Sequence, residues 1–240
     1  MGLLREMLEA VGKREEAEIC REYEEGTKEA YHFHFMERGE IQSSRPCKLV
    51  RPLALGLLEE DEKKSAAAKL DRLCRNRKYR IGTGFLSTPF ILPVLAEYGY
   101  LNTAYQMLQN TKEPGWLTMV EQGATSVWES YNGFDENGHP RQSSFNHYSL
   151  GAVCSFLFTH VCGIQAAGER HFVIRPLPGG KLSFARAELL SPYGIVKSGW
   201  EKKGKQYAYR IEIPANCTAK IVLPDGSARE AAAGTYIFSA

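Results

Sequence analysis

The chain has 240 residues, a formal net charge of +2 and 43% hydrophobic residues, the composition of an ordinary soluble globular protein. Its lysines and arginines are scattered among acidic neighbours, which argues against a nucleic-acid partner. The longest apolar stretch, Leu150 to Ile164, is interrupted by His160 and is too short to cross a bilayer, so we expect no membrane partner. The length allows one large domain or two modest ones.

The N-terminus shows no apolar signal-peptide core, and the six cysteines form no CxxC pair. We interpret the cysteines as reduced thiols of a cytoplasmic protein, with disulfides as the alternative. His32 and His34 would diverge on a helix and have no carboxylate cluster beside them, so we predict no metal. The Gly82-Thr83-Gly84 segment lacks the last glycine of a dinucleotide fingerprint, so we predict no cofactor.

The first two thirds of the chain show apolar residues at helical spacing. Gly12 is expected to end the first helix and Gly99 the fifth, each after the last apolar turn. A long loop rich in glycine, asparagine and aromatic residues is predicted over 114–144. About seven helices are predicted, at residues 4–11, 17–31, 46 or 52 to 58, 66–73, 89–98, 102–108 and 145–162.

After Gly168 the apolar pattern changes to a period of two, which predicts strands. Turn signals such as Pro224-Asp225-Gly226 separate them, as in an antiparallel β-sandwich. The fold class is therefore α + β with two domains, a helical domain at 1–166 and a small β-sandwich at 167–240. The strands are predicted at residues 171–175, 181–190, 193–202, 206–213, 217–223 and 234–239.

A loop of this length inside a compact domain is either functional or evidence that a helix has been overlooked. Its aromatic and polar residues favour function, so the long loop is the candidate functional site. Its tryptophans could stack on sugar rings, while its carboxylates and amides could bind hydroxyls. Glu129 follows Trp128, and a carboxylate beside an aromatic ring can be desolvated for proton transfer. From these residues alone, an ordinary surface glutamate remains the alternative. His147 could contact a ligand or lie in the core.

Several segments occur in the order of one known family. They are Thr83-Gly84-Phe85-Leu86-Ser87-Thr88-Pro89, Pro114-Gly115-Trp116, Gly123-Ala124-Thr125-Ser126-Val127-Trp128-Glu129 and Ser144-Phe145-Asn146-His147-Tyr148-Ser149-Leu150-Gly151-Ala152. They resemble the C-terminal half of the catalytic domain of bacterial α-L-rhamnosidases, glycoside hydrolase family 78. Arg175-Pro176 and Ser191-Pro192-Tyr193-Gly194 resemble the sandwich domain that follows it.

The resemblance implies a partial (α/α)6 barrel and inverting hydrolysis of terminal rhamnose from a rhamnosylated glycoside or oligosaccharide. It assigns the general base to Glu129 and sugar contacts to His147, Trp116 and Trp128. The family's general acid lies in an upstream acidic motif that residues 1–80 do not resemble, so we expect a catalytically incomplete fragment. Ser130-Tyr131 and Leu117-Thr118 depart from the family pattern and leave the sugar and aglycone open.

Two other functions stay open, and enzymatic activity of the isolated chain is uncertain. One is a non-catalytic carbohydrate-binding protein that uses the aromatic loop as a platform. The other is an (α/α)6 hydrolase for a different sugar. A partial barrel would also leave apolar helix faces uncovered, at Leu4/Met7/Leu8/Val11 or Phe156/Leu157/Val161. We therefore predict a homodimer through the truncated helical face.

Overall fold

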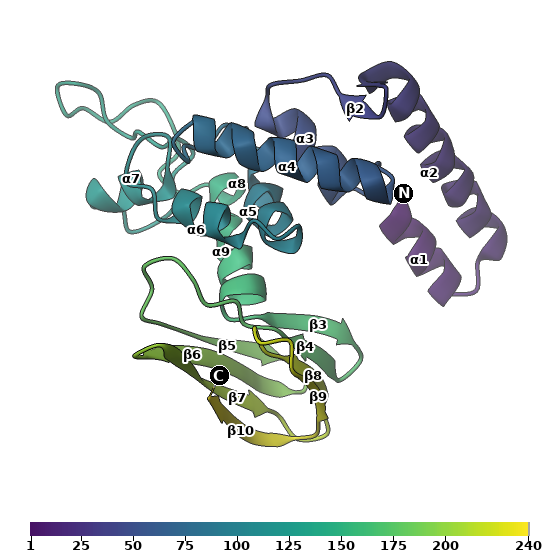
Figure 1. Cartoon of the computed structure of the whole chain (residues 1–240), viewed down its shortest axis with the longest axis vertical. Helices are drawn as coiled ribbons and strands as arrows, with labels where there is room; N and C mark the ends of the chain where they lie inside the picture. Colours follow the sequence, from purple (N-terminus) through teal and green to yellow (C-terminus); the bar gives the residue numbers. More distant parts are fainter. Residues whose placement is uncertain (240) are drawn as a thin grey trace.

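The computed structural model describes residues 1–239, which form a helical part followed by a sheet part (Figure 1). These residues contain nine α-helices and one π-helix, η1. Their bounds are α1 Gly2–Ala10, α2 Arg14–Phe35, α3 Pro46–Ala54, α4 Glu60–Asn76, α5 Thr88–Glu97, α6 Leu101–Leu108, α7 Trp116–Glu121, α8 Tyr148–Gly151, α9 Val153–Phe156 and η1 Leu157–Val161. Two short strands, β1 (Met36–Glu37) and β2 (Glu40–Ile41), pair between α2 and α3.

Six of the helices pack as three consecutive pairs, α1–α2, α3–α4 and α5–α6. Leu49, Leu70 and Leu95 are fully buried at the centre of the α3–α6 packing. Gly99 ends α5 as predicted, because its φ of +87° lets the Tyr100 N–H donate to the Leu95 carbonyl at 2.7 Å. The predicted class, part of a helical barrel followed by a sheet domain, is confirmed.

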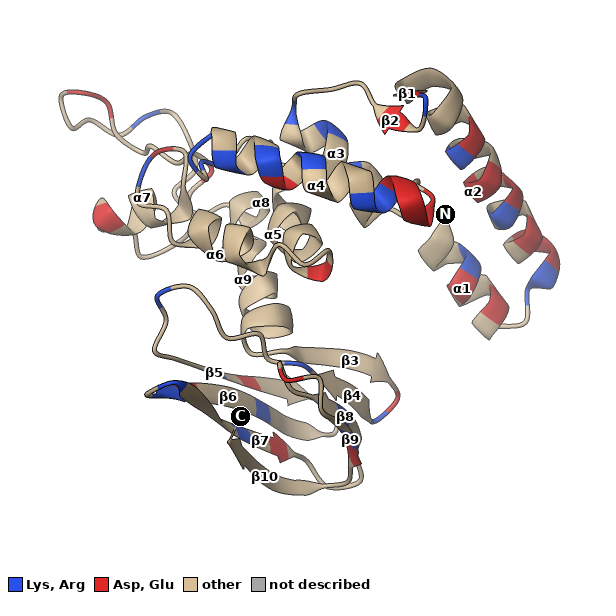
Figure 2. Ribbon diagram, in the orientation of Figure 1, with Lys and Arg blue, Asp and Glu red and all other residues tan. Residues whose placement is uncertain are grey.

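The α1–α2 pair extends away from the other helices (Figure 1). Charged residues line much of α2 (Figure 2), yet α1 has no buried residue, and Leu3, Met7 and Val11 are 79%, 66% and 71% exposed. The apolar face predicted on this helix is therefore uncovered. The second predicted apolar face is largely covered, because Phe156 and Val161 are buried in the core, and only Leu157 is exposed, at 37%.

The predicted helix 145–162 was wrong in its extent. Residues 144–147 pair with another loop segment instead, so α8 begins at Tyr148 and gives way to α9 and then to η1. The predicted loop 114–144 also contains a helix, α7, which starts at Trp116. No helix among residues 1–239 combines the length and apolar character that a bilayer span requires.

The sheet part is a sandwich of two four-stranded sheets, with orders β10-β7-β6-β5 and β3-β4-β8-β9. Its strands are β3 Ile164–Gly168, β4 His171–Ile174, β5 Phe184–Ser191, β6 Gly194–Lys203, β7 Gln206–Ile213, β8 Thr218–Val222, β9 Ala228–Ala231 and β10 Gly234–Ser239. The prediction missed β3 and β9, and the β4–β8 pair is parallel rather than antiparallel. The division predicted between residues 166 and 167 falls within β3.

Hydrogen bonds join the sheet part to the end of the helical part. The Trp200 indole N–H donates to the Val161 carbonyl at 2.8 Å, and the Tyr105 hydroxyl of α6 donates to the Leu177 carbonyl at 2.6 Å. Glu97, at the end of α5, accepts hydrogen bonds from His160 at 3.0 Å and from Arg175 at 2.6 Å. These contacts fasten the sandwich to the end of the helical part.

We predict that Glu97→Gln lowers the free energy of unfolding by about 1–2 kcal/mol at neutral pH. The hydrogen bonds from His160 and Arg175 outweigh partial burial and lower the pKa of Glu97 to about 2. The carboxylate's contribution is therefore complete above its unfolded pKa of about 4.3 and disappears as the pH falls towards 2. Solvent screening weakens this stabilisation, since the Glu97 side chain is 44% exposed.

Urea unfolding followed by circular dichroism, at pH values from neutral down to acid, measures the effect. The difference between variant and wild type should shrink below about pH 4.3. Glu230→Gln is the control, because Glu230 forms no ion pair within residues 1–239. A difference that stays constant with pH would contradict the assignment.

Candidate active site

Two segments of the loop between α7 and α8 run side by side. The Glu129 N–H donates to the Ser144 carbonyl at 2.9 Å, and the His147 N–H donates to the Val127 carbonyl at 2.8 Å. The Ser126 hydroxyl adds a bond to the Phe145 carbonyl. This pairing places Glu129 and His147, the two polar residues predicted for the site, on adjacent segments.

Glu129 is half-buried and held by one oxygen. Its Oε2 accepts the Ser144 N–H at 2.9 Å, so the Ser144 backbone bonds both the peptide N–H and the side chain of Glu129. Among residues 1–239, no group hydrogen-bonds the other oxygen, Oε1. The carboxylate is thus oriented and still has an oxygen that could accept a proton.

The two predicted tryptophans are buried rather than open to a ligand. Trp128 is 4% exposed, with the rings of Phe134 and Phe145 set edge-on to its indole at 5.6 and 4.9 Å. Trp116 is 6% exposed, and its indole N–H donates to the Leu150 carbonyl at 3.0 Å. In this structure both tryptophans pack inside the helical part, and their contact with a sugar remains a prediction.

His147 lies in an exposed stack of rings that sequence analysis did not single out. Phe85 stacks on one side at 5.0 Å and Tyr148 on the other at 5.1 Å; these rings are 44% and 85% exposed. The His147 Nδ1 accepts the Ser149 N–H at 3.2 Å and caps α8, which leaves Nε2–H as a donor in the neutral ring. Both rings lie within the family-like motifs, and that was the only sequence signal for them.

Asp135 is a second carboxylate of the same loop. Asp135 accepts backbone N–H bonds from His139 at 2.8 Å and Asn137 at 2.9 Å, and these bonds lower its pKa. A carboxyl group with a lowered pKa is a poor proton donor at neutral pH. Residues 1–239 hold no group of three or more His, Cys, Asp or Glu side chains arranged for a metal ion.

Two family models match the chain. The bacterial α-L-rhamnosidase six-hairpin glycosidase domain matches residues 1–161, and the bacterial α-L-rhamnosidase C-terminal domain matches residues 163–238. The chain belongs to the bacterial α-L-rhamnosidase family. The resemblance seen in the sequence motifs is confirmed.

Relatives of the family agree in sequence and in fold. An α-L-rhamnosidase of Streptomyces avermitilis is 32% identical over 78% of this chain, and one of Formosa agariphila is 32% identical over 90% of it. The chain spans only 18% and 24% of the lengths of these two relatives.

Solved α-L-rhamnosidases superpose on almost the whole chain. The Aspergillus terreus enzyme matches with a TM-score of 0.94 and 29% identity, over 99% of this chain and 29% of its own. The Streptomyces avermitilis enzyme complexed with L-rhamnose matches with a TM-score of 0.92 and 27% identity, over 100% of this chain and 26% of its own.

We predict that Gly133→Ala disturbs the candidate site through Trp128. A Cβ at the buried Gly133 would lie 2.6 Å from the Trp128 ring and 2.9 Å from the Phe145 ring, and both rings are confined. Such overpacking costs about 1–3 kcal/mol of stability. Urea unfolding followed by tryptophan fluorescence measures the loss.

Gly84→Ala is the matched control. A Cβ at Gly84 meets no atom within 4 Å, and no left-handed φ restricts that position. Its stability should equal or slightly exceed that of the wild type. Equal stability of the Gly133→Ala protein would show that Trp128 does not lie against Gly133.

Proposed function

We propose that the protein acts in the inverting hydrolysis of terminal α-L-rhamnosyl groups from a glycoside or oligosaccharide, with Glu129 as general base. The observation that carries this proposal is the Glu129 carboxylate, anchored through Oε2 by the Ser144 N–H with Oε1 free. The family assignment supports the substrate class, as does the similarity to a structure complexed with L-rhamnose.

In this mechanism Oε1 of Glu129 takes a proton from a water molecule as the water oxygen bonds to the anomeric carbon. The glycosidic C–O bond breaks on the opposite face, and its oxygen takes a proton from a general acid. The two carboxyl groups of an inverting enzyme stand roughly 6.5–9.5 Å apart to leave room for the water. We propose that the general acid belongs to an acidic motif of the family that residues 1–80 do not resemble.

The sugar is proposed to lie against the Phe85–His147–Tyr148 stack. Flat rings cover the C–H faces of a pyranose, and the His147 Nε2–H can donate to a hydroxyl. Trp116 and Trp128 are also proposed to contact the sugar, and the rings of Tyr131 and Phe145 pack edge-on against them. We further propose that the chain divides into two domains, residues 1–166 and residues 167–240. We also propose a cytoplasmic location, which the six free cysteines support.

We predict slight turnover of aryl α-L-rhamnosides by the 240-residue chain, because loss of general-acid assistance costs about 10²–10⁴-fold. Glu129→Gln should abolish the remaining hydrolysis, and Tyr148→Ala should raise KM. Release of the aryl alcohol measures both. Glu136→Gln is the control, as an exposed carboxylate of the same loop.

Turnover that survives Glu129→Gln would refute the base assignment. Rapid cleavage of an alkyl α-L-rhamnoside, whose leaving group needs protonation, would refute the placement of the acid outside the chain. Calorimetry with L-rhamnose then tests the alternative of a non-catalytic carbohydrate-binding protein. That alternative predicts that the wild type and Glu129→Gln both bind L-rhamnose and that neither of them hydrolyses a rhamnoside.

The uncovered face of α1 supports a further proposal, a two-fold homodimer through the α1–α2 pair. Leu3, Leu4, Met7 and Val11 form a contiguous set of exposed apolar side chains, and monomers rarely expose large apolar patches. Covering such a patch recovers about 25 cal/mol per Å² of apolar surface.

We predict a dimer in light scattering at micromolar concentration. The double variant Leu4→Glu/Met7→Glu should be a folded monomer, because two charges would have to be buried in the interface. Leu190→Glu is the control, since Leu190 is 80% exposed on the sheet part. A wild-type monomer would contradict the proposal.

A further inference from the structure

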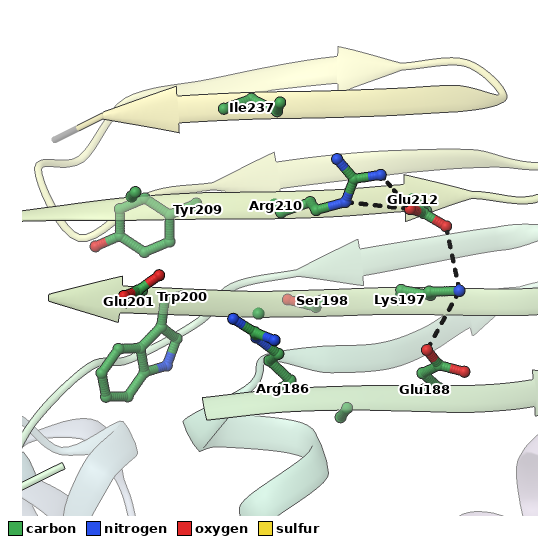
Figure 3. Close-up of a pocket in the computed structure, with 13 residues that line it drawn as sticks. Arg186, Glu188, Lys197, Ser198, Trp200, Glu201, Tyr209, Arg210, Glu212 and Ile237 are labelled. Atoms are coloured by element: carbon green, nitrogen blue, oxygen red, sulfur yellow. Dashed lines mark hydrogen bonds and ion pairs between the residues drawn. The ribbon is translucent and has the colours of Figure 1, made fainter. Parts of the chain in front are cut away.

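The outer face of the β5–β6–β7–β10 sheet carries a groove of about 470 Å³ (Figure 3). This volume lies within the range of about 300–1,000 Å³ typical of ligand sites. Side chains alternate along each strand, so those facing away from the sandwich core line the groove. The groove belongs to the sheet part, whereas Glu129 belongs to a loop of the helical part.

Small residues form the floor of the groove. Gly199 pairs with Arg186 on one side and Arg210 on the other, and Ala208 pairs with Glu201. A Cβ at Gly199 would lie 2.9 Å from Cγ of Arg186, so the missing side chain allows Arg186 to lie across β6. The Arg186 guanidinium group therefore occupies the space above Gly199 that a larger side chain on β6 would fill.

Most charges around the groove are already paired. Lys197 lies 3.2 Å from Glu188 and 3.5 Å from Glu212, and Arg210 lies 2.7 Å from Glu212 (Figure 3). Arg186 differs, since no carboxylate within residues 1–239 comes within 4.0 Å of it. Its guanidinium group lies 5.8 Å from the centroid of the Phe184 ring. Arg186 is thus the one cation of the groove whose N–H donors remain available to a ligand, among residues 1–239.

We propose that this groove binds an anionic oligosaccharide, whose acidic group pairs with Arg186. A guanidinium group matches carboxylate or sulfate oxygens with two parallel N–H donors. The carboxylates of Glu201 and Glu212 can accept from sugar hydroxyls, and the 70% exposed Ile237 offers an apolar wall for C–H groups. This role goes beyond the proposed hydrolysis, because it needs neither Glu129 nor turnover.

Other ligand classes fit the groove less well. Nucleic acid requires a continuous positive surface, whereas Lys197 and Arg210 are paired with Glu188 and Glu212, and Glu201 is paired with Lys203. Within residues 1–239, only Arg186 of the groove is left for an acidic group. Stable protein interfaces are depleted of charged residues at their centre, and this groove has charges throughout. The hydroxyl groups of an oligosaccharide can donate to the carboxylates of the groove and accept from its cations, so this ligand class fits the mixed charges best.

Calorimetric titration at low ionic strength tests the proposal with three probes. Trigalacturonate supplies carboxylates, a κ-carrageenan tetrasaccharide supplies sulfate esters, and fully methyl-esterified trigalacturonate is the neutral comparison. Binding of one anionic probe or both, weakened by added salt, is the expected result. The preferred anionic probe then identifies the acidic group.

Arg186→Gln should weaken that binding about tenfold, as expected for one charge-assisted hydrogen-bonding partner. Ala208→Gln, which fills the floor and keeps every charge, should weaken it as well. Arg229→Gln is the matched control, because Arg229 also lies over an aromatic ring, 5.2 Å from that of Tyr236, but on β9 of the other sheet. Unchanged melting transitions verify that the variants fold.

Three results would overturn the proposal: no binding of either anionic probe, equal binding of the methyl-esterified probe, or undiminished binding by both groove variants. Glu129→Gln should bind the probes as the wild type does. The titration therefore succeeds or fails independently of the hydrolysis assays.

Discussion

The packing of the Trp128 side chain governs the geometry of the candidate active site. Its ring belongs to a small apolar cluster with Met119 and Leu150, apart from the main core. Its backbone N–H donates to the Met119 sulfur at 3.4 Å, which ties the loop to α7. Because Glu129 is the next residue, a fixed Trp128 also fixes the direction in which the Glu129 side chain leaves the backbone. Ser144 then completes the orientation. A site of this kind functions only when its groups are held within about 0.5 Å of the productive geometry.

The sequence predicted those elements in which local pattern and burial agree. β7 is an example, because its apolar residues Tyr209, Ile211 and Ile213 recur at every second position and all three are buried. The edge strands β3 and β9 gave no such signal, since they are built from residues such as Ala, Gly and Glu with low strand propensity. They form because β4 and β8 offer unpaired backbone beside them, which is a property of the assembled sheet. The parallel direction of the β4–β8 pair is likewise a property of the assembled sheet, which the pattern within either strand does not reveal.

For the candidate site, the sequence motifs predicted Glu129 and His147, and the structure lays the segments that carry them side by side. The burial of the tryptophans could not be inferred, because it depends on Gly133 leaving room for the Trp128 ring and on Phe145 arriving from the far end of the loop. Phe85 reaches His147 from a segment before α5, and no spacing in the sequence relates the two. The motifs therefore predict candidate polar groups, whereas packing decides which aromatic rings remain exposed.

The sandwich is tied to the same site through one run of helical turns. His147 caps α8, which continues through α9 into η1, and the last carbonyls of that run, at Val161 and Cys162, are hydrogen-bonded by Trp200 and Ser198 of β6. Gly163 follows at a backbone crossing so close that a Cβ would lie 2.1 Å from the carbonyl carbon of Arg175. Carbonyls at a helix end need such partners once they are buried. The sheet part thus supplies the hydrogen-bond partners at the C-terminal end of the same run of turns that His147 caps at its N-terminal end.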